Sequence, residues 1–335
     1  MSQFDSSILS LIKKNCKGKQ HIKLSVGTLA NGEKKIHVFN ETGEIKNDND
    51  IYEIGSITKT FTTSLMAMNI FNGEMSLDDS IQKYISDLNL SDYYPSLERL
   101  ATHTAGYASH LPNSSWESTK MMMGLIFTGS VNKGKMPFRL DFEKMKHLLQ
   151  KNKVHDKEYS FQYSNFSIAL IGYAVGVVSG RGYWDTMNDF LANELGLKHT
   201  YTGTCKDKNL QGFDGRNRPC GNWIWNNDLV APAGDISSTA DDLLTYADIN
   251  MNEKRPYLSL CHEKYASTKN HDMGLGWRLN KDANHVLWHM GGTGSFSSYL
   301  SFDKHKKLGC VVLSNYRIDP MNKIGKSVLE YLQRQ

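Results

Sequence analysis

The hydrophobic positions of this chain follow a strand-like pattern at both ends and a helix-like pattern between them. Apolar residues alternate over 21–30 and 33–39, and Asn31-Gly32 between these runs is a type I′ turn signal, so the two runs predict a β-hairpin. Near the other end, short apolar runs bounded by turn residues predict strands at 276–280, 285–290, 297–302 and 308–313.

Apolar residues at helical spacing predict helices in the middle of the chain and at its two extremes. They cover 4–16, a helix opening at Ser56, one starting at 77–79, and then 141–151, 165–179, 183–195, 241–251 and 320–333. Strands at both ends with helices between predict an α+β fold. We expect a single domain over 1–335, with an antiparallel sheet lobe (about 1–75 and 236–335) flanked by helices and an inserted, mostly helical lobe (about 76–235).

Composition narrows the classes of protein this chain can be. Its 335 residues are 39% hydrophobic and 22% charged, as in ordinary soluble enzymes, and the net charge is only +4. The basic clusters at Lys13-Lys14 and 304–307 are short and have no interleaved aromatic residues. We therefore expect no nucleic-acid partner. There are no repeats, coiled-coil heptads or charge blocks of a scaffold protein, and nothing specifies an oligomeric state.

The same pattern argues against membrane insertion and export. No apolar run reaches the ~18 residues that a membrane helix requires. The N-terminal stripe of Phe4, Ile8, Leu11 and Ile12 is interrupted by polar residues and lacks a continuous signal-peptide core. We expect no membrane segment and a cytoplasmic location, unless the sequence has been trimmed.

Metal and cofactor signatures are missing from the sequence. The five cysteines are scattered without a C-x-x-C pair, although Cys205 and Cys220 flank one loop and could form a disulfide. His103 and His110 lie seven residues apart in a loop-like stretch, which is a poor metal pair. No H-E-x-x-H, G-x-S-x-G or phosphate-binding glycine motif occurs. We expect neither metal nor cofactor.

The first candidate for chemistry is Ser56, which follows Gly55 at a helix start. Lys59 lies about one turn away, where its amine can take the serine proton, and the helix N-terminus offers free N–H groups to an oxyanion. Serine followed three residues later by lysine occurs at five places in the chain, so the spacing alone is also typical of a solvated helical pair.

Two further motifs could complete a hydrolase. Tyr163-Ser-Asn165 offers a phenolate, favoured near a lysine ammonium, that can accept a proton, and an amide that can donate to a substrate carbonyl. Without Ser56, a buried tyrosine before an N-cap asparagine is the better interpretation. His289-Met-Gly291-Gly292 ends a predicted strand and leaves N–H groups for an oxyanion, or is simply a glycine-rich turn beside a satisfied histidine. Trp223 and Trp225 could line a cleft or pack in the core.

The order Ser-x-x-Lys, Tyr-x-Asn, His-x-Gly resembles the serine β-lactamase and penicillin-binding protein superfamily, and within it the class C β-lactamase-like branch. The resemblance spans about residues 20–332. It includes the text around the three motifs and the blocks at 100–106 and 231–247. It implies a β-lactamase/transpeptidase-like catalytic domain.

That resemblance implies an acyl-enzyme mechanism with Ser56 as nucleophile and with Lys59 and Tyr163 sharing the proton transfer. It also implies an oxyanion hole from the N–H groups of Ser56 and Gly292, and a contact from Asn165 to the acyl-side amide. Which of Lys59 and Tyr163 is the base stays open.

One departure bears on the substrate. Many members of this superfamily carry lysine where this chain has His289, so the permanent cation that would hold a substrate carboxylate is missing here. We therefore expect a serine hydrolase acting on amide or ester bonds of small D-amino-acid-like molecules or short peptides, as a peptidase, carboxypeptidase or esterase. The alternatives are a β-lactamase and a non-turnover penicillin-binding sensor.

Overall fold

A computed structural model describes residues 4–130, 137–203, 209–223, 225, 228–318 and 321–335. A nine-stranded sheet dominates this part of the chain, in the order β3-β2-β1-β13-β12-β11-β10-β9-β8. Its strands are β1 (Leu24–Ala30), β2 (Glu33–Phe39), β3 (Glu44–Ile45), β8 (Ala266–Ser267), β9 (Asp272–Met273), β10 (Arg278–Asn280), β11 (Ala283–Gly292), β12 (Ser297–Asp303) and β13 (Leu308–Ser314).

The two ends of the chain meet at the centre of this sheet. β1 pairs antiparallel with β13, with Leu24 opposite Ser314 and Ala30 opposite Leu308. Every pair of neighbouring strands in the sheet is antiparallel. The predicted hairpin and the four predicted C-terminal strands are therefore confirmed, as is the α+β class.

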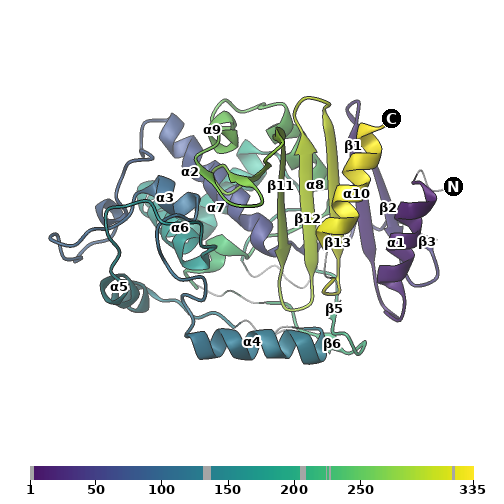
Figure 1. Cartoon of the computed structure of the whole chain (residues 1–335), viewed down its shortest axis with the longest axis horizontal. Helices are drawn as coiled ribbons and strands as arrows, with labels where there is room; N and C mark the ends of the chain where they lie inside the picture. The colour runs from purple at the N-terminus through teal and green to yellow at the C-terminus, as the bar shows by residue number, and fades with distance from the viewer. Residues whose placement is uncertain (1–3, 131–136, 204–208, 224, 226–227, 319–320) are drawn as a thin grey trace.

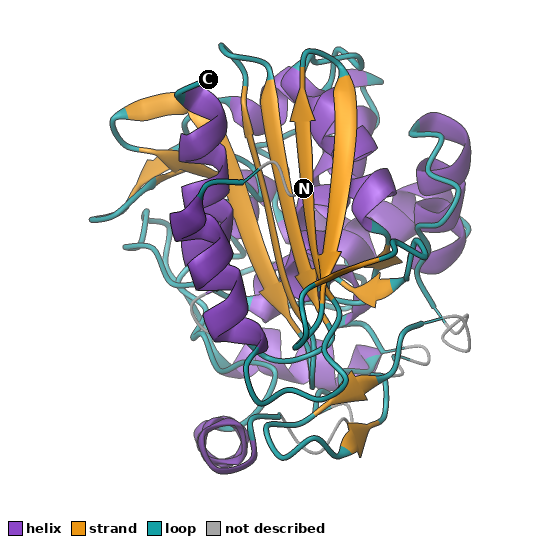
Figure 2. Ribbon diagram, turned by 90° about the vertical axis from the view of Figure 1, so that its right-hand side faces the viewer, coloured by secondary structure: helices purple, strands orange, loops and turns teal. Residues whose placement is uncertain are grey.

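Helices cover both faces of the sheet (Figures 1 and 2). α10 (Met321–Gln333) and α1 (Ser6–Cys16) lie over one face and bury a core that includes Ile8, Val312 and Leu329. α8 (Ala240–Met251) packs on the opposite face against β1, β12 and β13. Behind it lies the larger core around α2 (Thr58–Phe71) and α6 (Asn165–Ser179).

Most helices begin and end close to the predicted positions. α5 spans Phe142–Lys151, and α7 (Tyr183–Asp189) continues as a π turn over Phe190–Glu194. The further short helices are α3 (Leu97–Ala101) and α9 (Leu258–His262). Two small two-stranded sheets, β4 (Tyr52–Glu53) with β7 (Ser237–Ser238) and β5 (Gly212–Phe213) with β6 (Pro219–Cys220), complete the fold.

The predicted helix starting at residues 77–79 is wrong. Asp79 turns its carboxylate back to accept a hydrogen bond from the backbone N–H of Ser76 at 2.8 Å, and only a 3₁₀ turn (Ile81–Tyr84) follows. The backbone N–H groups of Ile81 and Leu97 bond to Pro95 and Asp79 respectively. A short acidic side chain that satisfies a backbone donor locally competes with helix formation.

The structure also contains a long helix that the sequence pattern did not predict. α4 (Ser115–Thr128) begins with a capping box in which Ser114 and Glu117 bond to each other's backbone N–H groups. It runs along the lower edge of the molecule in Figure 1, and none of its residues is fully buried. Within the described ranges, no helix is long and apolar enough to cross a membrane.

Candidate active site

Ser56 is placed by a sharp turn between β4 and α2. Gly55 has φ +51°, and a Cβ atom there would lie 2.6 Å from the backbone nitrogen of Gly292. Only glycine fits both the positive φ and this close approach. The turn continues as a 3₁₀ turn (Gly55–Ile57) into α2, which leaves Ser56 half-buried at the start of the helix.

Lys59 lies beside Ser56 inside the protein. Its Nζ atom is 3.0 Å from Ser56 Oγ and donates to the carbonyl of Ala233 at 2.6 Å. The side chain is fully buried, and this burial lowers the pKa of Lys59. Tyr163 opposes the shift and the charge of Arg278 adds to it. A lysine so placed is more readily neutral, and a neutral amine can accept the proton of Ser56.

Tyr163 also lies beside Lys59. The Lys59 ammonium is 4.9 Å from the centre of the Tyr163 ring. The ring also contacts His103, with 4.8 Å between the ring centres, and His103 Nδ1 accepts a hydrogen bond from the backbone N–H of Ser164 at 3.2 Å. Burial holds the pKa of His103 well below 6.5, so the imidazole that packs against the Tyr163 ring is neutral.

The end of β11 supplies the glycines predicted to face the nucleophile. A Cβ atom added at Gly291 would come within 2.0 Å of the Ile54 carbonyl oxygen and 2.8 Å of the Ser56 nitrogen. Residues 289–292 pair with β12, whereas β10 reaches only as far as Trp288. The turn at Ser56 and the backbone around Gly292 are therefore in direct contact, an arrangement in which two N–H groups can converge on an oxyanion.

A cavity of about 160 Å³ opens beside Ser56. Asn165, the first residue of α6, lines it together with Gly292 and the two tryptophans Trp223 and Trp225. The asparagine is not the N-cap of α6, because Ser164 has that role through its bond from the Ser167 N–H at 3.2 Å. Both tryptophans are buried and pack edge to face, so they are core residues and cavity walls at once.

His289 takes the place of the third-motif lysine, but its side chain is buried. Burial holds the pKa of His289 well below 6.5, and the nearby charges of Arg278 and Lys59 lower it further. Its Nδ1 lies 2.9 Å from the carbonyl of Met290, which can only accept, so Nδ1 carries the proton. The third motif therefore contributes no fixed positive charge.

Three charged residues of the site were not predicted from the sequence. Arg317 lines the cavity together with Gly292. Glu53 is only 2% exposed, and its carboxylate accepts bonds from the backbone N–H of Trp223 at 2.7 Å and the hydroxyl of Thr293 at 2.5 Å. Arg278 lies against the ring of Tyr163. Glu53 stands next to the Ser56 motif, whereas no local signal marks Arg278.

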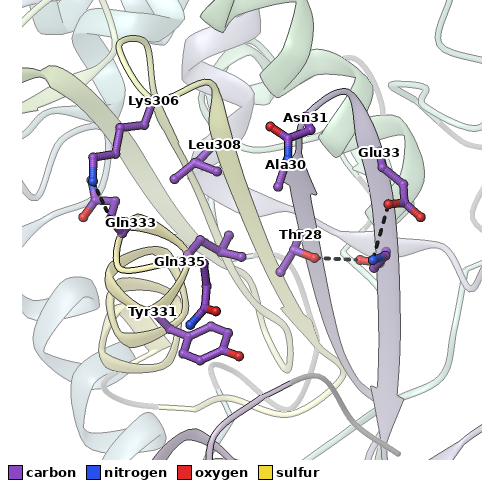
Figure 3. A pocket seen from close by; sticks show the side chains of 11 residues that line it. Thr28, Ala30, Asn31, Glu33, Lys306, Leu308, Tyr331, Gln333 and Gln335 are labelled. Atoms are coloured by element: carbon purple, nitrogen blue, oxygen red, sulfur yellow. Dashed lines mark hydrogen bonds and ion pairs between the residues drawn. The ribbon is translucent and has the colours of Figure 1, made fainter.

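Away from the site, a cavity of about 590 Å³ lies between β1, β2 and the end of α10 (Figure 3). Thr28 and Glu33 line one side of it and Lys306 another, and none of the predicted site residues reaches it.

The described residues contain no group of three or more His, Cys, Asp or Glu placed to hold a metal ion. Whether Cys205 pairs with Cys220, which the sequence left open, lies outside the described residues, since Cys205 is not among them.

These features define a member of the beta-lactamase family. The family model described as beta-lactamase matches residues 19–332, nearly the whole chain, and the chain belongs to that family. The resemblance deduced from the three motifs is thereby confirmed. The protein is a serine hydrolase of the β-lactamase and penicillin-binding protein type.

Among individual proteins, the chain is similar to a beta-lactamase of Pseudomonas fluorescens, with 26% identity over 341 residues that cover 87% of this chain and 88% of the relative. The octameric penicillin-binding protein homologue from Pyrococcus abyssi has the same fold, with a TM-score of 0.79 at 20% identity over 98% of this chain and 77% of that one. A beta-lactamase/D-alanine carboxypeptidase from Pseudomonas syringae aligns with a TM-score of 0.75 at 20% identity over 98% of both chains.

Proposed function

We propose that this protein hydrolyses amide or ester bonds of small D-amino-acid-like substrates through an acyl-enzyme on Ser56. The observation that carries the proposal is the 3.0 Å contact between Ser56 Oγ and the buried amine of Lys59, whose pKa is lowered by burial. A base within hydrogen-bond reach of a serine hydroxyl is the arrangement that nucleophilic catalysis requires.

In the proposed reaction, Ser56 Oγ forms a bond to the substrate carbonyl carbon and its proton passes to Lys59 or Tyr163. The backbone N–H groups of Ser56 and Gly292 stabilise the oxyanion. The bond to the leaving nitrogen or oxygen then breaks as that atom takes the proton. Water hydrolyses the acyl-enzyme and releases the acid, and Ser56 recovers its proton.

The choice of substrate follows from the cavity and from the third motif. Asn165 can hold an acyl-side amide, and Trp223 and Trp225 form an apolar wall for the adjoining side chain. Because His289 is neutral and buried, the motif lacks the lysine that many members direct at a substrate carboxylate. Peptides, amides and esters of D-amino acids are therefore favoured over penicillins, and the name of the Pseudomonas syringae relative, beta-lactamase/D-alanine carboxypeptidase, includes both substrate classes.

Covalent labelling tests the nucleophile directly. A fluorophosphonate probe should add one equivalent to the wild type and none to Ser56→Ala, with the label on the peptide that contains Ser56. Ser10→Ala is the matched control, because Ser10 is also followed three residues later by a lysine. Labelling that survives in Ser56→Ala would falsify the assignment. Lys59→Met and Tyr163→Phe should each slow acylation by ~10²-fold, the scale of a lost general base.

Turnover assays distinguish the proposed function from two alternatives. The β-lactamase alternative has support in the name of the Pseudomonas fluorescens relative. It predicts faster turnover of a chromogenic cephalosporin than of D-amino-acid p-nitroanilides or p-nitrophenyl esters. A non-turnover sensor would release one equivalent of product and stop. Sustained turnover of the D-amino-acid substrates, several-fold faster than that of the cephalosporin, is the outcome we expect.

A further inference from the structure

Arg278 on β10 is brought to Tyr163 by the register of the sheet. It pairs with Trp288 on β11, the residue immediately before His289. The central carbon of its guanidinium lies 5.0 Å from the Trp288 ring and 5.8 Å from the Tyr163 ring. β10 pairs no further along β11, so Arg278 lies where the edge of β11 that faces β10 becomes unpaired, while the other edge stays paired with β12.

The guanidinium of Arg278 has no acidic partner among the described residues. Its Nε atom is buried and makes no hydrogen bond. By contrast, four other arginines, Arg99, Arg181, Arg218 and Arg255, each lie within 2.6–2.9 Å of a carboxylate oxygen. Arg278 is half-buried, and partly removing a cation from water without a carboxylate partner carries a cost, so its position indicates a role other than stability.

The groups that face Arg278 come from several elements, and most are cationic or neutral. They are Lys59 on α2, His103 after α3, His271 before β9, His289 on β11 and Lys326 on α10, which lies 5.1 Å from the Trp288 ring. Burial lowers the pKa of each of the three histidines. Among these described neighbours, Tyr163 is the group that can carry a negative charge.

We propose that Arg278 positions Tyr163 and that its fixed positive charge stabilises the negative charge that Tyr163 gains when it gives up its proton during acyl transfer. The neighbouring strand thus supplies Tyr163 with a cation that the third motif lacks, while a second arginine, Arg317, lines the cavity beside Gly292. Lys59 cannot serve as a permanent charge, because its role in the mechanism requires it to be neutral for part of the cycle. This inference rests on the proposed function of Ser56.

The test compares Arg278→Met and Arg278→Lys with wild type on an uncharged p-nitrophenyl ester. We expect kcat/KM of Arg278→Met to fall by about 10²-fold through kcat, with KM changed by less than about threefold. The acidic limb of its profile of kcat/KM against pH should move to higher pH, because the charge of Arg278 lowers the pKa of Lys59, and without that charge the amine becomes neutral only at higher pH. Arg278→Lys, which keeps the charge, should recover at least about tenfold.

Lys326→Met is the matched control, because Lys326 also lies over Trp288, whereas the cations described over the Tyr163 ring are Lys59 and Arg278. It should leave both kcat and the pH profile unchanged. Circular dichroism and the urea midpoint establish that each variant is folded. If Arg278→Met does not fold, the comparison of Arg278→Lys with wild type still shows whether the geometry of the cation changes kcat and the pH profile.

The outcomes separate this inference from the proposed function. If the wild type is not labelled at Ser56, the proposed function fails first. If labelling succeeds but Arg278→Met keeps the kcat and pH profile of wild type, the role of Arg278 is overturned. A loss confined to carboxylate-bearing substrates and expressed in KM would also overturn it, because Arg278 would then be binding the substrate instead of acting on Tyr163.

Discussion

Replacing Glu53 by alanine removes a buried acceptor from two walls of the Ser56 cavity at once. Its carboxylate receives the backbone N–H of Trp223 at 2.7 Å and the hydroxyl of Thr293 at 2.5 Å, and both partners line that cavity. Glu53 itself is 2% exposed, so water does not readily replace the lost oxygens.

The size of the effect follows from the number of donors left unsatisfied. Each buried donor without an acceptor costs about 1–3 kcal/mol, so Glu53→Ala should destabilise the fold by about 4 kcal/mol. Glu53→Gln keeps one acceptor oxygen and should cost about 2 kcal/mol. Acylation of Ser56 should slow by about 10²-fold in the alanine variant, because the two walls that position the substrate lose their common anchor.

Urea unfolding at neutral pH measures the first quantity, and the rate of fluorophosphonate labelling measures the second. Glu74→Ala is the matched control, because its side chain is exposed and makes no hydrogen bond to another described residue. That variant should stay within about 0.5 kcal/mol of wild type. If Glu53→Ala is as stable as Glu74→Ala, the carboxylate does not hold the two walls together and the reasoning fails.

Two further predictions concern backbone packing and pH. Gly291→Ala places a methyl group 2.0 Å from the Ile54 carbonyl oxygen and should cost about 3 kcal/mol and most of the acylation rate, whereas Gly309→Ala, whose methyl group would lie 3.2 Å from Leu29, should cost less than about 1 kcal/mol. Equal urea midpoints would contradict the steric argument. Hydrogen bonds from His262 and then Lys304 lower the pKa of Glu253 from 4.5 to about 2. Because the folded pKa is the lower one, this stabilisation is present above about pH 4.5 and is lost as pH falls toward 2. The stability difference between wild type and Glu253→Gln should vanish over that window, and a constant difference would count against it.

The sheet could be predicted closely because its signals are local. Alternating apolar positions and the Asn31-Gly32 turn place the hairpin within three residues of its observed bounds. α4 was missed for a physical reason, because Trp116, Ile126 and Phe127 are 70%, 68% and 65% exposed and form no buried stripe. The sequence contains the capping box of α4, but the residues that follow it lack the buried apolar stripe by which helices were predicted.

The same distinction between local and distant signals applies to the site. Ser56 and Lys59 are close in sequence, so helical spacing alone predicts their contact. Arg278 and Tyr163 meet only through the sheet register, which no local pattern encodes. The roles assigned to the individual site residues, the boundary between the two lobes and the cytoplasmic location remain predictions.

The pairing of β1 with β13 has a consequence for how the enzyme comes to be active. Leu24, near the start of the chain, pairs with Ser314, near its end. β11, which places Gly292 against Ser56, is joined to this pair of strands through β12. Contacts this distant in sequence form late and slowly. A nascent chain that has not yet made β13 already contains Ser56, Lys59 and Tyr163, but β11 and its partners β10 and β12 are not yet joined to β1 through β13. During refolding, the ability to acylate should therefore appear with the last strands to pair, after the helices have formed.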